Sequence, residues 1–187
     1  MNKGTYHKSG LVLWFTGLSG AGKTTIAEGV SEKLKKRSIS SKIIDGDDVR
    51  KNKNVHLGFS EGDIKLNNKL IADMCVKDRL LFDVILVPII SPYRISRTEA
   101  RAKLSSGFYE IHIDASIECV KARDVKGLYA KVAMRQINNM IGIAHSNPYE
   151  VPLTPDVSIM TEKETIDQSV TKICDFILSK FGRMVAI

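Results

Sequence analysis

Apolar and polar residues along the chain form segments that predict a regular succession of strands and helices. Short apolar runs, at 11–15 and 83–90, predict strands that are buried on both faces. Longer stretches, at 24–36 and 61–81, carry apolar residues at helical spacing. Because strands and helices alternate, the pattern indicates an α/β protein with a largely parallel central sheet.

The rest of the chain continues this alternation, with one exception. Further strands are expected at 41–44, 108–113 and 157–160, and further helices at 97–104, 116–123 and 162–181. The exception is the stretch 124–155, which shows little periodicity and several turn signals. Irregular connections of that length are uncommon unless they serve an active site. We therefore expect a single domain over 1–187 with a mobile lid at about 124–155.

The first predicted strand leads into a glycine-rich sequence with a specific chemistry. Residues 17–24 read GLSGAGKT and match the phosphate-binding pattern G-x-x-x-x-G-K-[ST]. Between a strand and a helix, such a loop directs backbone N–H groups and the positive end of the helix dipole at one point. Lys23 is placed to reach the β- and γ-phosphates, and the Thr24 hydroxyl to ligate Mg²⁺. The chain is therefore expected to bind a nucleoside triphosphate.

Composition and charge exclude few classes of function. The chain has 43% hydrophobic and 26% charged residues, as globular proteins do, and it has no span of about 20 apolar residues. Since residues 1–10 are polar rather than signal-like, a cytoplasmic location is expected. The net charge of +7 suits polyanionic substrates, and the low aromatic content argues against nucleic acid. Cys75, Cys119 and Cys174 lack metal-ligand spacing and are expected to be buried free thiols.

The sequence also narrows the class of P-loop protein. GTPases read guanine with an N-K-x-D segment, and the residues from Asn52 to Val55 begin that way but lack the Asp. Motor ATPases carry an acidic residue at the end of a hydrophobic strand, to which Asp114 is a weak match. A small-molecule kinase needs an acceptor pocket with a carboxylate near the phosphates and a basic lid. The sequence favours this third class.

Candidate chemistry follows the predicted strands at their carboxyl ends, where ligands bind in open α/β sheets. In DGDDVR at 45–50, a carboxylate could hold Mg²⁺ or accept a proton from an attacking hydroxyl. Arg50 could bind an acidic group on the acceptor. The alternative is that these residues form a turn whose acidic side chains are only solvated. Phe59 either stacks on a base or pins its loop to the core, and the residues alone favour the core. Ser91 could bind substrate phosphate or act as a nucleophile; the alternative is that it only caps a helix or ends a strand.

A basic sequence opens the expected lid. Arg123 and Lys126 lie at its start, in RDVKGLY. On a segment that closes over phosphates, such cations would stabilise the charge of the transition state and help to exclude water.

Taken together, these segments resemble the adenylylsulfate (APS) kinase family, whose members transfer the γ-phosphoryl group of ATP to the 3′-hydroxyl of adenosine 5′-phosphosulfate and so make PAPS. The matching segments are GLSGAGKTT at 17–25, DGDDVR at 45–50, LGFS at 57–60, ISPYR at 90–94, RDVKGLY at 123–129 and NPYEVP at 147–152. The P-loop alone indicates only nucleotide binding, whereas the combination is specific and covers nearly the whole chain. The resemblance implies a P-loop nucleoside-kinase-like three-layer fold, ATP and Mg²⁺ as cofactors, and a cytoplasmic homodimer that activates sulfate without nucleic acid or membrane partners.

The resemblance also implies roles for individual residues. ATP would be held by Gly17, Leu18, Ser19, Gly20, Ala21, Gly22, Lys23, Thr24 and Thr25. Mg²⁺ would be held by Thr24 and Asp45. The acceptor would be bound by Asp47, Arg50, Phe59, Asn67, Ile90, Ser91, Lys126 and Met140. Catalysis would use Lys23, Asp45 as the base, and Ser91, which is often described as a phosphoserine intermediate. Because direct in-line transfer needs no covalent step, we expect Ser91 to have a contact or structural role instead.

The chain departs from the family pattern on the acceptor side. The family segment E-x-D-R-x-x-N-I-R-R carries an acceptor-binding arginine where this chain has Ile64. In the lid, Ala133 replaces an arginine, and Met140 and Ile141 replace a Phe-Thr pair whose Phe covers the adenine. Met140 is soft and apolar and would cover a base less rigidly. Two alternatives therefore stay open: a related kinase for another nucleotide, such as cytidine diphosphoramidate, and a non-catalytic ATP-binding paralogue.

Overall fold

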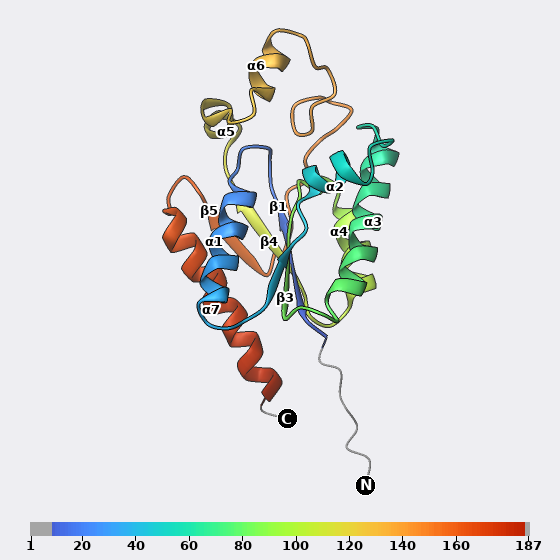
Figure 1. The fold of residues 1–187 in the computed structure, drawn as a ribbon. Helices are drawn as coiled ribbons and strands as arrows, with labels where there is room; N and C mark the ends of the chain where they lie inside the picture. Colours follow the sequence, from blue (N-terminus) through green and yellow to red (C-terminus); the bar gives the residue numbers. More distant parts are fainter. Residues whose placement is uncertain (1–8, 186–187) are drawn as a thin grey trace.

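Five parallel strands form one sheet at the centre of the molecule (Figure 1). The structure is a computed structural model that describes residues 9–185. The strands are β1 (Leu11–Thr16), β2 (Ser41–Ile43), β3 (Val84–Pro88), β4 (Phe108–Asp114) and β5 (Val157–Met160), in the spatial order β2-β3-β1-β4-β5. In the middle strand, Leu13 is paired with Leu86 on one side and Tyr109 on the other. The predicted α/β class with a parallel sheet is confirmed.

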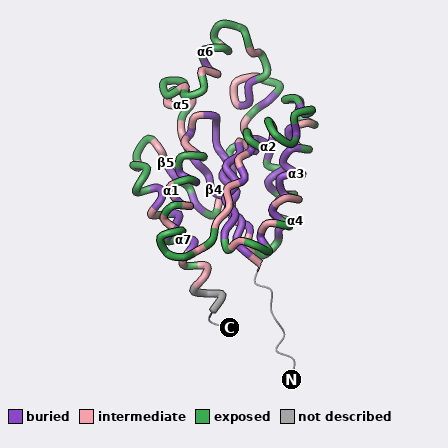
Figure 2. Tube along the Cα trace, in the orientation of Figure 1, coloured by how far each residue is buried: buried purple, intermediate pink, exposed green. Residues whose placement is uncertain are grey.

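Helices cover both faces of this sheet and make the three layers that were expected (Figure 1). One face carries α1 (Lys23–Lys35) and α7 (Ile166–Val185), and the other carries α3 (Glu61–Asp78) and α4 (Arg94–Leu104). Because successive strand residues point to opposite faces, Leu13 and Phe15 pack toward α1 and α7 while Val12 and Trp14 pack toward α3 and α4. Figure 2 shows the buried strands between helices whose outer surfaces are exposed.

Two short helices are present that the sequence pattern does not predict. Helix α2 (Gly46–Asn52) begins directly after Asp45, whose side chain accepts hydrogen bonds from backbone N–H groups of the first turn. Helix α6 (Leu128–Ala133) lies within the stretch expected to be irregular, shortly after α5 (Ile117–Arg123). Helices of six or seven residues have less than two full turns, so apolar periodicity is a weak signal for them; of the three helices this short within residues 9–185, only α5 was predicted, at 116–123.

The predicted elements differ from the observed ones mainly at their ends. The last helix begins four residues later than expected, because Thr165 caps it in a reciprocal pair with Gln168. Helix α4 begins three residues earlier, at Arg94, and the strand expected over 83–90 ends at Pro88. These shifts place the turn that follows β3 at residues 89–93, where Ser91 lies.

Two further expectations concern the chain as a whole. Cys75 and Cys174 are buried free thiols as expected, whereas Cys119 is a partly exposed free thiol.

Within residues 9–185, no helix combines the length and the apolar character needed to cross a membrane. Most of the N-terminal segment that was judged not to be signal-like, residues 1–8, lies outside the described part of the chain.

Candidate active site

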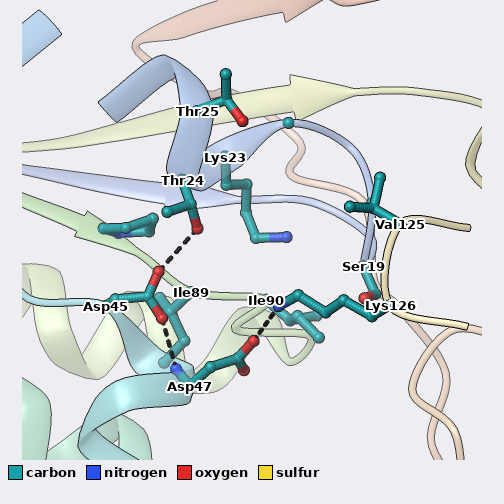
Figure 3. A pocket seen from close by; sticks show the side chains of 13 residues that line it. Ser19, Lys23, Thr24, Thr25, Asp45, Asp47, Ile89, Ile90, Val125 and Lys126 are labelled. Carbon is teal, nitrogen blue, oxygen red and sulfur yellow. Dashed lines mark hydrogen bonds and ion pairs between the residues drawn. The ribbon is translucent and has the colours of Figure 1, made fainter. Parts of the chain in front are cut away.

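The P-loop leaves the carboxyl end of β1 and enters α1, and its backbone takes a shape that only glycine allows at two points. Gly17 has a φ of 153°, and a Cβ there would lie 2.3 Å from the backbone oxygen of Ile113. Gly22, directly before α1, has a φ of 104°. The loop lines a cavity of about 130 Å³ above the sheet (Figure 3). The backbone N–H groups at the start of α1 therefore face a space suited to phosphate.

Lys23 extends along the inner side of this loop and is only 9% exposed. Its Nζ donates hydrogen bonds to the backbone oxygens of Gly17, at 2.9 Å, and Leu18, at 2.7 Å. Burial lowers the pKa of Lys23 to about 8, although the nearby Asp47 acts to raise it. An anion brought beside this amine would favour its charged form.

Asp45 joins the P-loop to helix α2. The Thr24 hydroxyl donates a 2.7 Å hydrogen bond to Asp45 Oδ2, and Oδ1 accepts one of 2.8 Å from the backbone N–H of Asp47. The Thr24 and Asp45 oxygens are hard ligands of the kind that Mg²⁺ prefers. Across the part of the chain that is described, no three His, Cys, Asp or Glu residues gather into a metal cage. A Mg²⁺ ion here would therefore take its other ligands from phosphates and water.

The segment expected to form a lid contacts this site through Lys126, which forms an ion pair with Asp47. Both side chains are half-exposed. Although burial acts to raise it, the hydrogen bond and charge of Lys126 hold the pKa of Asp47 below its usual range. Figure 3 shows the resulting series of contacts from Thr24 through Asp45 and Asp47 to Lys126.

A second cavity, of about 170 Å³, lies beside the P-loop and is lined by both Phe59 and Met140. The Phe59 side chain is 47% exposed, so the expectation from the residues alone that it packs into the core is wrong. The Arg50 guanidinium lies 4.7 Å from the centre of the Phe59 ring and donates hydrogen bonds to the backbone oxygens of Leu57 and Gly58. Arg50 therefore supports the loop that presents Phe59 to the cavity.

The remaining predicted acceptor residues surround a smaller cavity of about 30 Å³ next to the second one. Asn67 is buried there, and its Oδ1 accepts a 2.8 Å hydrogen bond from Asn54. Ile64, which stands at the position of the family arginine, is 2% exposed and packs with Tyr93 and Ile141. The part of the wall that Ile64 and Ile141 form is apolar.

Ser91 lies at the turn after β3 and adjoins the same small cavity. It is 1% exposed with a φ of 44°, and its hydroxyl has no hydrogen-bond partner among residues 9–185. Its backbone oxygen accepts a 2.6 Å hydrogen bond from Arg97, and the preceding carbonyl, that of Ile90, accepts one of 2.6 Å from Thr16. Since a serine nucleophile needs a base in contact with its hydroxyl, this geometry favours a structural role.

The P-loop residues divide into two groups around the first cavity. Six of the predicted ATP ligands line it: Ser19, Gly20, Gly22, Lys23, Thr24 and Thr25. Leu18 and Ala21 are instead packed in the core, and the Gly17 carbonyl supports Lys23. These three residues therefore support the shape of the loop and do not line the cavity.

Two residues at the site were not singled out from the sequence, although both lie in motifs that were. The Tyr129 hydroxyl donates a 2.8 Å hydrogen bond to the backbone oxygen of Ser19 and so ties α6 to the P-loop. Asn147, in NPYEVP, is buried and contacts the loop of Phe59. The sequence shows each of these polar residues within a motif, but it does not show which residues they contact.

Comparison with known proteins gives a consistent result. A family model described as adenylylsulphate kinase matches residues 9–160. An adenylyl-sulfate kinase from Halothermothrix orenii is 39% identical over 177 residues, which cover 93% of this chain and 92% of that protein. One from Gloeothece citriformis is 41% identical over 164 residues, with 88% and 92% covered.

Solved structures show the same similarity. The Mycobacterium tuberculosis APS kinase CysC, in complex with AMPPNP and APS, superimposes with a TM-score of 0.85 at 33% identity and covers 91% of this chain and 98% of its own. A hexameric APS kinase from Thiobacillus denitrificans has a TM-score of 0.66 at 28% identity, with 94% of this chain and 30% of that one covered. A gluconokinase from Sinorhizobium meliloti, at 13% identity and a TM-score of 0.66, shares the fold alone.

Proposed function

The chain belongs to the adenylylsulphate kinase family, and we propose that it transfers the γ-phosphoryl group of ATP to the 3′-hydroxyl of APS, which gives PAPS and ADP and activates sulfate. The observation that carries this proposal is the position of Asp45, which contacts the P-loop residue Thr24 and begins the helix that reaches the acceptor cavity. Asp45 lines the cavity proposed for ATP, and the helix that it caps carries Asp47, which lines both that cavity and the one proposed for the second nucleotide.

Each residue of the site has a separate role in the proposed phosphoryl transfer. The N–H groups of the P-loop and Lys23 bind the β- and γ-phosphates, and the acceptor base lies between Phe59 and Met140. Asp45 orients the 3′-hydroxyl and takes its proton as the new O–P bond forms and the bond to the β-phosphate oxygen breaks. Mg²⁺, with Thr24 and Asp45 among its contacts, would neutralise charge on the transferred group when bound. Catalysis then depends mainly on positioning.

The lid completes the site. Lys126 reaches Asp47 from the lid, and Arg123 donates hydrogen bonds to Thr161, at 3.0 Å to the hydroxyl and 2.8 Å to the backbone oxygen. Lys126 lines the P-loop cavity and braces the phosphoryl group in transfer, Arg123 holds the start of the lid, and closure of the lid keeps water from competing with the acceptor hydroxyl.

The apolar wall at Ile64 supports a second candidate, a kinase of the same fold for a different nucleotide acceptor. Specificity follows from pocket contacts, and an isoleucine offers no charge to a sulfated phosphate. A coupled ADP-release assay separates the candidates by comparing APS with CDP-linked and plain adenosine nucleotides, with the product identified by mass. Turnover with APS alone supports the proposal. Turnover with a CDP-linked nucleotide supports the second candidate, and ATP binding without turnover supports a non-catalytic paralogue.

The assembly in solution is part of the proposal. We propose a homodimer, as the resemblance implies, although the Thiobacillus denitrificans relative is described as hexameric. Light scattering of the purified protein tests this, and a mass other than twice that of the 20.8 kDa chain would overturn it.

A further inference from the structure

Asn147, near the end of the lid, is 3% exposed and joins three segments that are far apart in the sequence. Its Nδ2 donates hydrogen bonds to the backbone oxygens of Phe59, at 3.0 Å, and Asn139, at 2.9 Å. Its Oδ1 accepts one of 3.1 Å from the Tyr93 hydroxyl. Both partners of Nδ2 are carbonyl oxygens, which only accept, so the orientation of the amide is fixed.

Two of these hydrogen bonds end at two walls of the acceptor cavity, one formed by the loop of Phe59 and the other by the segment of Asn139 and Met140. One holds the carbonyl of Phe59 itself, and the other holds that of Asn139, whose next residue is Met140. Phe59, Asn139 and Met140 all line the 170 Å³ cavity. A single planar amide therefore connects the two walls, and its size limits how far they can separate.

The third hydrogen bond anchors this amide to Tyr93, directly before α4. Tyr93 follows the turn after β3, is buried, and packs against Ile64 and Ile141. The other side-chain contact between lid and acceptor side described above, Lys126 with Asp47, is half-exposed, and pairs of that kind contribute little. Losing a donor from a buried and fully bonded amide has a larger cost, because its partner carbonyls remain unpaired.

We propose that Asn147 is a positioning residue that sets the separation of Phe59 and Met140 and thereby the affinity for the nucleotide acceptor. This inference rests on the proposed function in taking the cavity between these residues as the acceptor site. None of the three side-chain hydrogen bonds of Asn147 reaches the P-loop. The effect of Asn147 therefore falls on the acceptor and spares ATP.

The kinetic test replaces Asn147 with Asp, which keeps the shape but removes both donors and places negative charge against two carbonyl oxygens. Asn138→Asp is the matched control, because Asn138 is exposed, lies in the same lid and undergoes the same change of charge. We expect Asn147→Asp to raise the KM for APS by about tenfold or more and to leave the KM for ATP within about twofold of the wild type. Asn138→Asp keeps wild-type values.

Tyr93→Phe removes only the third hydrogen bond and gives a milder variant, which carries the test if Asn147→Asp does not fold. The expected rise in the KM for APS is then smaller, and the KM for ATP again stays unchanged. The proposal is overturned if Asn147→Asp behaves as Asn138→Asp does. It is also overturned if the KM values for both substrates stay at wild type while kcat falls with the folded fraction, because a merely structural role predicts that pattern.

Hydrogen–deuterium exchange of the free protein gives a readout that does not depend on activity. We expect Asn147→Asp to speed exchange in the segments 56–62 and 137–143 while β1 and α1 exchange as in the wild type. Unchanged exchange in both segments overturns the positioning role. If the wild-type protein does not phosphorylate APS, the proposed function fails, and the exchange result still decides whether Asn147 holds the two walls together.

Discussion

The Thr24 hydroxyl donates a hydrogen bond of 2.7 Å to Asp45, and this contact connects the two halves of the site. Thr24 belongs to the P-loop, whereas Asp45 caps the helix that leads toward the acceptor cavity. The same carboxylate thus has one oxygen on the ATP side and one in the cap of α2. Its position is fixed by structure before any substrate binds, as catalysis by positioning requires.

The first prediction separates the two roles of Asp45. Asp45→Asn retains an oxygen that can cap α2 but loses the charge and the basicity, so we expect kcat to fall by about 100-fold or more with little loss of stability. Asp45→Ala also removes the cap and should lower the free energy of unfolding by about 1 kcal/mol. Steady-state kinetics and urea denaturation measure these effects. Near wild-type turnover in Asp45→Asn would show that Asp45 is not the base.

The second prediction concerns the protonation of Lys23. Burial lowers its pKa to about 8, so near that pH part of the free protein carries a neutral amine. Because bound phosphates raise the pKa again, ATP binding at pH 8 should take up a proton and should weaken as the pH rises further. Isothermal titration calorimetry in buffers of different ionisation enthalpy measures the uptake. Lys23→Arg is the control, since arginine stays charged; equal uptake in both proteins would assign the proton to another group.

The third prediction concerns the stacking surface at Phe59. Phe59→Ala should raise the KM for APS by about 5-fold to 100-fold, since base–aromatic stacking contributes about 1–3 kcal/mol per base. The KM for ATP should not change, and stability should change little because the ring is half-exposed. Phe59→Tyr keeps the aromatic face and serves as the control. Equal KM values for APS in the Ala and Tyr variants would exclude stacking on this ring.

The fourth prediction concerns Ser91. Its hydroxyl has no hydrogen-bond partner among the described residues, so its removal leaves no polar group unpaired. Ser91→Ala should therefore keep kcat within about fivefold of the wild type, as expected for direct in-line transfer. Incubation with ATP labelled at the γ-phosphate should leave no label on the protein. A labelled wild-type protein together with an inactive Ser91→Ala variant would establish a phosphoserine step.

The sequence was sufficient for the parts of the structure that depend on local pattern. The P-loop, the strands and the long helices follow from apolar periodicity and from glycines at fixed spacing, both of which are written in consecutive residues. Helices α2 and α6 were missed because helices of six or seven residues give only a weak periodic signal, although that signal was enough for α5. The resemblance compensated for the first omission, since it assigned Asp45 and Asp47 to the site without knowledge of the helix.

The remaining features depend on contacts between distant residues. Asn147 and Phe59 are 88 positions apart, and no local pattern reveals that their segments meet. For the same reason the sequence alone favoured a buried Phe59. In the structure, Arg50 contacts the Phe59 ring and binds a backbone carbonyl of its loop, and the ring lies at the cavity. The environment of Ser91 likewise depends on Arg97, which reaches its carbonyl from the next helix.

The most direct test of the account is the transfer of a labelled γ-phosphoryl group from ATP to APS by the wild-type protein, with products separated and identified by mass. We expect the label to appear on the 3′-hydroxyl, as PAPS, in the same amount as the ADP formed. Label found only in inorganic phosphate or on a cytidine nucleotide, or no release of ADP with APS present, would contradict it.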